Sequence, residues 1–189
     1  MNNTVQFLQR LSAITPVSAE LRDLLTENIR HEEYRGHQVL YAAGQSDLKI
    51  AFIQSGLARN YYFDQDGEEH TTRFWMEGEF IFSYEGFRSK QAVEYLEVLE
   101  ASTLLTLTYI QVNEMLSQFK EMGKIVEFID QKYREGELMR DRLLAMTAEE
   151  RYRQYRKLNP QIFRRVPLRM IASYLNMTRG GLSRIMSRG

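Results

Sequence analysis

The last part of the chain carries side chains whose type and spacing suit binding to a polyanion. Arg179, Ser183 and Arg184 fall on one face of a short predicted helix, and Arg188 follows one turn after Arg184. Thr178 precedes them, where its hydroxyl can cap the helix by accepting a backbone N–H. A guanidinium offers paired donors that match the two acceptors of guanine in the major groove. This face therefore predicts contact with double-stranded DNA.

Two short helices are needed to present this face. The apolar residues of the first recur at helical spacing: Met170, Ile171, Tyr174 and Leu175. Those of the second are Leu182, Ile185 and Met186. Asn176, which tolerates a left-handed backbone, lies in the turn between them. The pattern predicts a helix-turn-helix. The alternative is a helical hairpin that only caps a core, and the row of arginines argues against it.

The segment IASYLNMTRGGLSR resembles the DNA-binding motif of the CRP/FNR family of bacterial transcription regulators, in its short Bacteroidetes-type form. The matching positions are Ala172, Leu175, Thr178, Leu182, Ser183 and Arg184. The resemblance implies base-reading roles for Arg179 and Arg184. Gly180 stands where the family prefers Glu, which can accept a hydrogen bond from cytosine. One base contact of the family is therefore expected to be missing.

Other cations extend the basic character of this end. Residues 147–189 carry ten Lys/Arg against two Asp/Glu, a net charge of +8, so the remainder of the neutral chain carries −8. Arg164, Arg165 and Arg169 are predicted to contact phosphates, which gives affinity without sequence preference and with strong salt dependence. The alternative is a solvated face.

Upstream of this end, short strand-like runs separated by turn residues predict an antiparallel sandwich or roll. The run resembles the cyclic-nucleotide-binding β-roll, a cupin-like double-stranded β-helix, at Tyr41, Gly44, Phe52, Ile53, Gly56, Gly78, Glu79 and Phe80. The expected class is α+β. The expected domains are a β-roll sensor domain over 1–115, a long dimerisation helix over 116–146 and a helix-turn-helix domain over 147–189.

The resemblance also locates the family's phosphate-binding cassette. Its Gly-Glu pair falls on Phe82-Ser83 and its arginine pair on Ala92-Val93. A buried phosphate without a guanidinium partner is costly to desolvate, so binding of cyclic nucleotides by the usual chemistry is not expected. Six residues form a candidate pocket for a less polar effector: Phe74, Phe80, Phe82, Ser83, Tyr84 and Arg88. The alternative is plain core.

A long helical segment of about 25 residues follows, with a narrow apolar seam. The seam residues are Met122, Ile125, Ile129, Met139 and Leu143. In the family, the equivalent helix forms a dimer interface, so a homodimer is expected. The alternative is a helix that packs only on its own roll.

Several classes of chemistry are excluded. Without cysteine the chain holds no disulfide and no cysteine-ligated iron–sulfur cluster. The three histidines have no metal-ligand spacing, and no nucleophile–base motif is present, so no enzyme activity, metal or cofactor is predicted. Neither a signal peptide nor a membrane span is visible, which predicts a cytoplasmic protein.

The predicted function is a transcription regulator that binds a palindromic operator as a dimer and is not gated by cyclic AMP. The candidate partners are double-stranded DNA, a second copy, RNA polymerase and an unidentified small-molecule effector. The alternative is a ligand-binding or protein-interaction module whose helix-turn-helix has lost operator recognition. Gly180 and Gly181 motivate it, because each lowers helix stability by up to ~1 kcal/mol relative to Ala.

Overall fold

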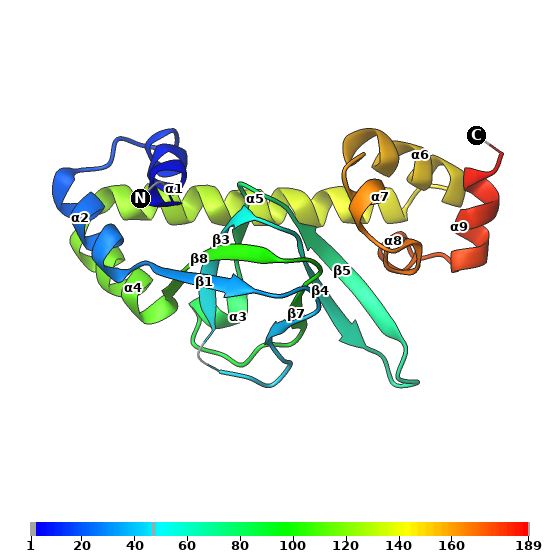
Figure 1. Ribbon diagram of the computed structural model, residues 1–189, viewed down its shortest axis with the longest axis horizontal. Coiled ribbons are helices and arrows are strands. Elements are labelled where there is room, and N and C mark those ends of the chain that lie inside the picture. Colours follow the sequence, from blue (N-terminus) through cyan, green and yellow to red (C-terminus); the bar gives the residue numbers. More distant parts are fainter. Residues whose placement is uncertain (1–2, 47, 189) are drawn as a thin grey trace. The chain divides into compact units, whose positions relative to one another are not determined.

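A computed structural model describes residues 3–46 and 48–188; residues 1–2, 47 and 189 of the expected domains lie outside the described part. The chain divides into two compact units. The roll unit contains the residues up to Asn60 and Phe74–Tyr133, and the C-terminal unit contains Tyr61–Arg73 and the residues from Arg134 on. The predicted α+β class, with an antiparallel roll, a long helix and further helices, is confirmed (Figure 1).

Two four-stranded sheets form the roll, with strand orders β1-β8-β3-β6 and β2-β7-β4-β5. The strands are β1 (Arg30–Tyr34), β2 (Val39–Tyr41), β3 (Lys49–Ser55), β4 (Ala58–Phe63), β5 (Glu69–Trp75), β6 (Phe80–Ile81), β7 (Tyr95–Val98) and β8 (Ser102–Thr108). Gly56 makes the turn from β3 to β4 at φ +105°, and a Cβ there would lie 2.0 Å from Ser102 Oγ. No other residue type fits this position without strain.

Helices close one face of the first sheet. The helices of the roll unit are α1 (Asn3–Ser12), α2 (Ala19–Asn28), α3 (Tyr84–Phe87), α4 (Tyr109–Gln118) and the first part of α5 (Lys120–Leu144). Ser18 caps α2 by accepting from the Leu21 N–H. The ring of Phe7 packs edge-on against Phe52 of β3 at 5.6 Å between centroids. The core of this unit is therefore shared by the sheet and the helices.

The aromatic run from Phe80 to Tyr84 has the pattern of a strand, but the strand in the structure is shorter. β6 ends at Ile81, and α3 begins at Tyr84, capped by Ser83, whose hydroxyl accepts from the Gly86 N–H. The hydroxyl of Ser83 satisfies an end N–H of this turn, which a strand would have paired with a neighbour. A run of aromatic residues favours strand and buried turn alike, so the sequence pattern alone gave the wrong boundary.

Helix α5 has the predicted length of 25 residues, but most of its seam is buried in its own chain. Met122, Ile125 and Ile129 are 4%, 1% and 4% exposed within the core of the roll unit, and Leu143 is 1% exposed in the C-terminal unit. For these four residues, burial favours the alternative of packing within the chain. Met139 remains 40% exposed and has Leu138 beside it at 53%.

Candidate nucleic-acid interface

The two predicted helices at the C-terminal end are present as α8 (Leu168–Tyr174) and α9 (Arg179–Met186). Asn176 takes a left-handed conformation at φ 50° in the turn between them, as predicted. Thr178 caps α9, with its hydroxyl accepting from the Gly181 N–H at 3.0 Å. Pro167 lies at the N-cap of α8. The adjacent glycines do not prevent α9 from forming.

A small apolar core holds these helices. Ala172, Leu175 and Leu182 are at most 1% exposed. Helix α6 (Ala148–Leu158) also contributes to this core: its Tyr155 packs against Tyr174 of α8, with ring centroids 4.8 Å apart. Met186, predicted to belong to the apolar stripe, is 36% exposed. The relative orientation of α8 and α9 is therefore set mainly by small and branched side chains at their crossing.

Arg151 has a structural role that the sequence did not reveal. Its guanidinium donates to the carbonyl oxygens of Leu175, of Asn176 at 3.2 Å and of Met146 at 3.0 Å. These contacts satisfy carbonyl groups at the end of α8 and in the turn, which no helix hydrogen bond reaches. Sequence analysis counted Arg151 only as part of the basic surface. No sequence signal separates it from the exposed arginines.

The residues predicted to contact DNA lie on the outer side of this fold. Thr178, Arg179, Gly180, Ser183, Arg184 and Arg188 are all exposed. The Arg184 Nε donates to the Gly180 carbonyl at 3.4 Å, so its side chain lies along α9 over the glycine. A Cβ at Gly180 would meet nothing within 4 Å. This face of α9 is therefore accessible to solvent. Its first two turns carry two exposed arginines, Arg179 and Arg184.

The predicted phosphate contacts lie on neighbouring elements. Arg164 and Arg165 belong to α7 (Ile162–Arg165), and Arg169 belongs to α8. Arg164 and Arg169 are exposed, whereas Arg165 is half-buried. α6 ends in two further exposed cations, Arg156 and Lys157. Cations at a helix C-terminus are favoured by the helix dipole, so part of this charge also stabilises α6.

The N-terminus of α6 is closed by a reciprocal cap. The Thr147 hydroxyl accepts from the Glu150 N–H at 3.4 Å, and the Glu150 carboxylate accepts from the Thr147 hydroxyl at 2.7 Å and from its N–H at 3.1 Å. The hydrogen bond from the Thr147 hydroxyl is the main reason that the pKa of Glu150 lies below its usual value. This arrangement fixes where α6 begins.

The hairpin of β4 and β5 contributes a segment to the C-terminal unit. The Ser173 hydroxyl of α8 donates to the Glu69 carbonyl at 3.0 Å and accepts from the Thr71 N–H at 2.9 Å. Arg73 pairs with Glu137 at 2.5 Å, and its guanidinium occupies the space that a Cβ at Gly136 would enter. The hairpin therefore contacts the first helix of the helix-turn-helix through specific hydrogen bonds.

Several of the six residues predicted to line an effector pocket take part in close aromatic packing. Phe82 is 4% exposed and packs edge-on against Tyr84, Tyr109 and Tyr133. The Ser83 N–H donates to the Tyr109 hydroxyl at 2.7 Å, and the Arg88 guanidinium lies 5.8 Å from the Tyr84 ring. Phe74 and Phe80 are half-buried. This packing favours the interpretation of these residues as core.

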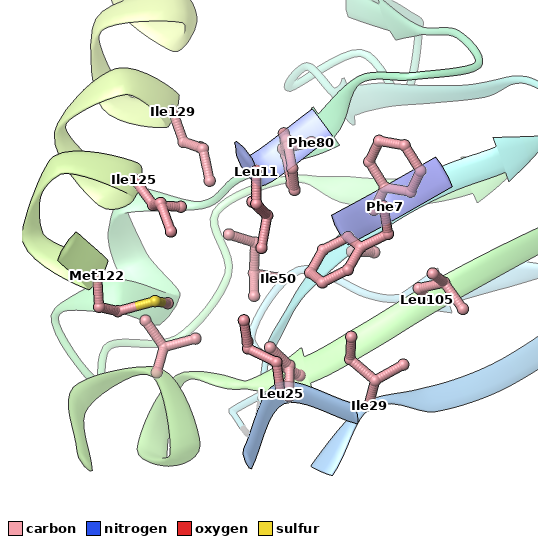
Figure 2. A pocket seen from close by; sticks show the side chains of 14 residues that line it. Phe7, Leu11, Leu25, Ile29, Ile50, Phe80, Leu105, Met122, Ile125 and Ile129 are labelled. Carbon is pink, nitrogen blue, oxygen red and sulfur yellow. The ribbon is translucent and has the colours of Figure 1, made fainter. Parts of the chain in front are cut away.

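Phe80 lines a different space, between α1, α2, the first sheet and α5. Figure 2 shows it surrounded by Phe7, Leu11, Leu25, Ile50, Met122 and Ile125, with no polar side chain among the labelled ones. Its volume is about 20 Å³, room for roughly one water, and its lining is apolar. It is a packing gap in the core.

The position of the family's arginine pair is closed by backbone contacts. Ala92 is 5% exposed, and its N–H donates to the Gln45 carbonyl while its own carbonyl accepts from the Gly44 N–H. The buried arginine of the roll is Arg59, which donates through Nε and Nη2 to the Glu97 carboxylate at 3.0 and 2.8 Å. Arg59 therefore neutralises a carboxylate of its own unit.

Comparison with known proteins identifies the roll. Residues 31–119 match the cyclic nucleotide-binding domain. The resemblance to the CRP/FNR regulators is confirmed. The cyclic nucleotide-binding domain contains all eight strands except the first residue of β1, together with α3 and α4. Among residues 3–46 and 48–188, no group of acidic or histidine side chains could hold a metal ion, and no helix has the length and apolar character to span a membrane.

Solved structures share the fold over most of the chain. FixK2 from Bradyrhizobium japonicum superposes with a TM-score of 0.74 at 16% identity, covering 85% of this chain and 83% of its own. A protein from Eubacterium rectale described as a transcriptional regulator of the CRP/FNR family has a TM-score of 0.75 at 12% identity, covering 93% and 87%. These likenesses establish the fold around the cyclic nucleotide-binding domain.

Curated relatives have a regulatory name. The chain is 23% identical over 171 residues to the anaerobic regulatory proteins of Haemophilus influenzae and Pasteurella multocida. The alignments cover 84% of this chain but 66% and 62% of those relatives, so the chain spans less than two thirds of their length.

Proposed function

We propose that this protein is a sequence-specific DNA-binding transcription regulator that binds a palindromic operator as a homodimer and is not gated by cyclic AMP. The observation that carries the proposal is the exposed face of α9, on which Arg179, Ser183 and Arg184 are aligned above a buried Leu182. Helices of this kind enter the major groove with their N-terminal residues against the base edges. The fold shared with regulators and the regulatory names of the relatives support it.

Dimerisation is proposed through α5. Leu138 and Met139 are adjacent exposed apolar side chains on a helix that is otherwise charged on its exposed side. Two copies related by a two-fold axis would present two α9 helices and would require two half-sites about one helical turn apart.

The direct test is selection of bound duplexes from random DNA. The expected result is a palindrome with guanine at a fixed position in each half. If the protein binds all duplexes with equal affinity, the alternative function, a module without operator recognition, replaces this one.

The absence of cyclic AMP gating is proposed because Ala92 and Val93 stand where the family has its phosphate-binding pair, so no guanidinium is present at that position. Calorimetric titration with cyclic AMP or cyclic GMP at micromolar concentration should give no heat of binding. Saturable tight binding of either nucleotide would contradict this part of the proposal.

A further inference from the structure

A small pocket lined by polar and apolar side chains opens inside the roll. Its volume is about 120 Å³. Glu32 and Tyr34 of β1, Lys49 of β3 and Thr106 of β8 line it. The strand register explains why they meet, because Thr106 is paired with Arg30 and with Ala51. Residues two positions away along each strand point to the same face of the sheet.

Some polar groups of this pocket have hydrogen-bond partners within the protein and others do not. The Lys49 ammonium pairs with Glu32 Oε1 at 2.5 Å, and the Tyr34 hydroxyl donates to Glu32 Oε2 at 2.5 Å. Burial opposes ionisation of Glu32, but these two hydrogen bonds outweigh it and hold the pKa of Glu32 below its usual value. Both carboxylate oxygens are therefore engaged, and the group remains an anion.

Thr106 differs from its neighbours. It is 2% exposed, and its hydroxyl lies near enough to the Glu32 carboxylate to lower the pKa of that group slightly by a weak hydrogen bond. No partner meets the distance and angle of a well-formed hydrogen bond to this hydroxyl. A buried hydroxyl without a partner destabilises the folded state. The Lys49 side chain is 40% exposed, and its pair with Glu32 uses one of the three ammonium N–H donors. The polar groups of the pocket that can still bind a ligand are thus mainly hydrogen-bond donors: the Lys49 ammonium and the Thr106 hydroxyl.

The rest of the lining is mostly apolar, with Tyr41 and Gln45 as its polar members. Leu40, Leu48 and Leu96 line the same pocket, and Leu96 is 1% exposed. A ligand that fits must present an acceptor group to Lys49 and Thr106 and an apolar part to the leucines. The volume limits it to about five to eight non-hydrogen atoms, far below the size of a nucleotide.

We infer that this pocket binds a small amphipathic monocarboxylate, with the carboxylate on Lys49 and Thr106 and the short chain against Leu40, Leu48 and Leu96. A carboxylate accepts charge-assisted hydrogen bonds from an ammonium and a bond from a hydroxyl. The Lys49–Glu32 pair is neutral, so the site tolerates one added negative charge at the exposed end of Lys49. This inference does not depend on DNA recognition.

The experiment uses pentanoate as the probe and the uncharged 1-pentanol and the cation pentylammonium as matched controls. Binding is measured by titration of backbone and methyl NMR shifts of the full chain. Pentanoate should bind saturably and shift Leu40, Leu48, Leu96 and Thr106, with both controls at least about tenfold weaker. Equal binding of 1-pentanol, tighter binding of pentylammonium, or no saturable binding of pentanoate would overturn the inference.

Variants separate recognition from stability. Lys49→Met should weaken pentanoate binding at least about tenfold, whereas Lys124→Met, at an exposed lysine of α5, should leave it unchanged. Thr106→Val should weaken binding several-fold without lowering the melting temperature, since the hydroxyl that it removes has no well-formed hydrogen bond. If Lys49→Met does not fold, Lys49→Arg should fold and retain binding. Unchanged affinity in Lys49→Met, or loss of binding in Lys49→Arg with the fold intact, would contradict the assigned anchor.

Discussion

In the roll unit, Arg59 and Lys49 are paired with carboxylates of the same unit, whereas the arginines of α9 face solvent. Arg59 is 2% exposed and bound twice to Glu97, and Lys49 is paired with Glu32. Arg179 and Arg184 are exposed, and the Arg184 guanidinium group donates only to a carbonyl of its own helix among the bonds described. These two cations of the roll are thus paired within their own unit, whereas the arginines of α9 remain accessible to solvent.

This difference shows why the net charge of a segment does not indicate whether a given arginine stabilises the fold or is accessible to a partner. Removing one member of a buried ion pair leaves an uncompensated charge, so such an arginine is required for folding. An exposed arginine contributes little to folding and can be aimed at an external anion. Arg151 is an exception within the C-terminal unit, since it donates to four carbonyls of its own chain.

The largest expected effect concerns α5, which takes part in both units. Ile129→Asp should lower the free energy of unfolding by ~4 kcal/mol or more, because it places a carboxylate in a core position that is 4% exposed. Urea unfolding followed by circular dichroism measures this. Wild-type stability of this variant would contradict the conclusion that Ile129 of α5 is buried within its own chain.

Leu138→Asp is the matched control, because Leu138 is 53% exposed. It should leave unfolding unchanged and convert a dimer to a species of the 22.4 kDa chain mass in sedimentation. If both Leu138→Asp and Met139→Asp remain dimeric, the dimer interface does not include these residues.

On the exposed side of the comparison, Arg184→Ala should reduce affinity for the selected operator by ~1–3 kcal/mol and relax preference at one position in each half-site. Its thermal stability should stay unchanged, because the side chain is exposed. Arg164→Ala is the contrasting variant, expected to weaken all duplexes alike and to reduce the salt dependence by about one unit. Fluorescence anisotropy at several salt concentrations measures both. Equal loss on operator and random DNA in Arg184→Ala would exclude base reading.

Ser173→Ala tests a contact inside the C-terminal unit, with an expected loss of ~1 kcal/mol in local stability. The hydroxyl bonds both Glu69 and Thr71, so the Thr71 amide should exchange with solvent about fivefold faster or more in hydrogen-exchange NMR. Ser187→Ala, at an exposed serine of the same unit, is the control. Unchanged protection of Thr71 would mean that Ser173 does not hold the hairpin.

The smallest expected effect is at Gly180. Gly180→Ala should raise the free energy of unfolding by up to ~1 kcal/mol, because a Cβ there meets nothing and alanine favours helix. Gly180→Glu should in addition create a preference for cytosine at one position of the half-site, since a carboxylate can accept from its amino group. Thermal unfolding and repeated site selection test the two variants. A destabilised Gly180→Ala would show that bare backbone is needed there.

Much of the molecule could be predicted from the chain alone, and the reasons differ by element. The α8–α9 pair was predictable because its apolar spacing, the Thr178 cap and the left-handed Asn176 all act within a few residues. β1 was missed because its sequence, RHEEY, has no apolar alternation. It becomes a strand by pairing with β8 over five residues, which is a contact distant in sequence.

What the sequence determined by itself was therefore local: the α+β class, the turn and caps of the helix-turn-helix, and the separation of a basic end from an acidic body. Tertiary structure alone decided which charges and seams are available to a partner. Ile125 and Met122 have the periodicity of an interface, yet a neighbouring sheet and helices bury them. In the sequence Thr106 does not differ from other threonines of strands, and only the packing around it shows that its hydroxyl lacks a well-formed hydrogen bond. Helical periodicity and residue type specify which side of an element is apolar or charged, but the element that covers that side is brought there by contacts between residues far apart in the chain.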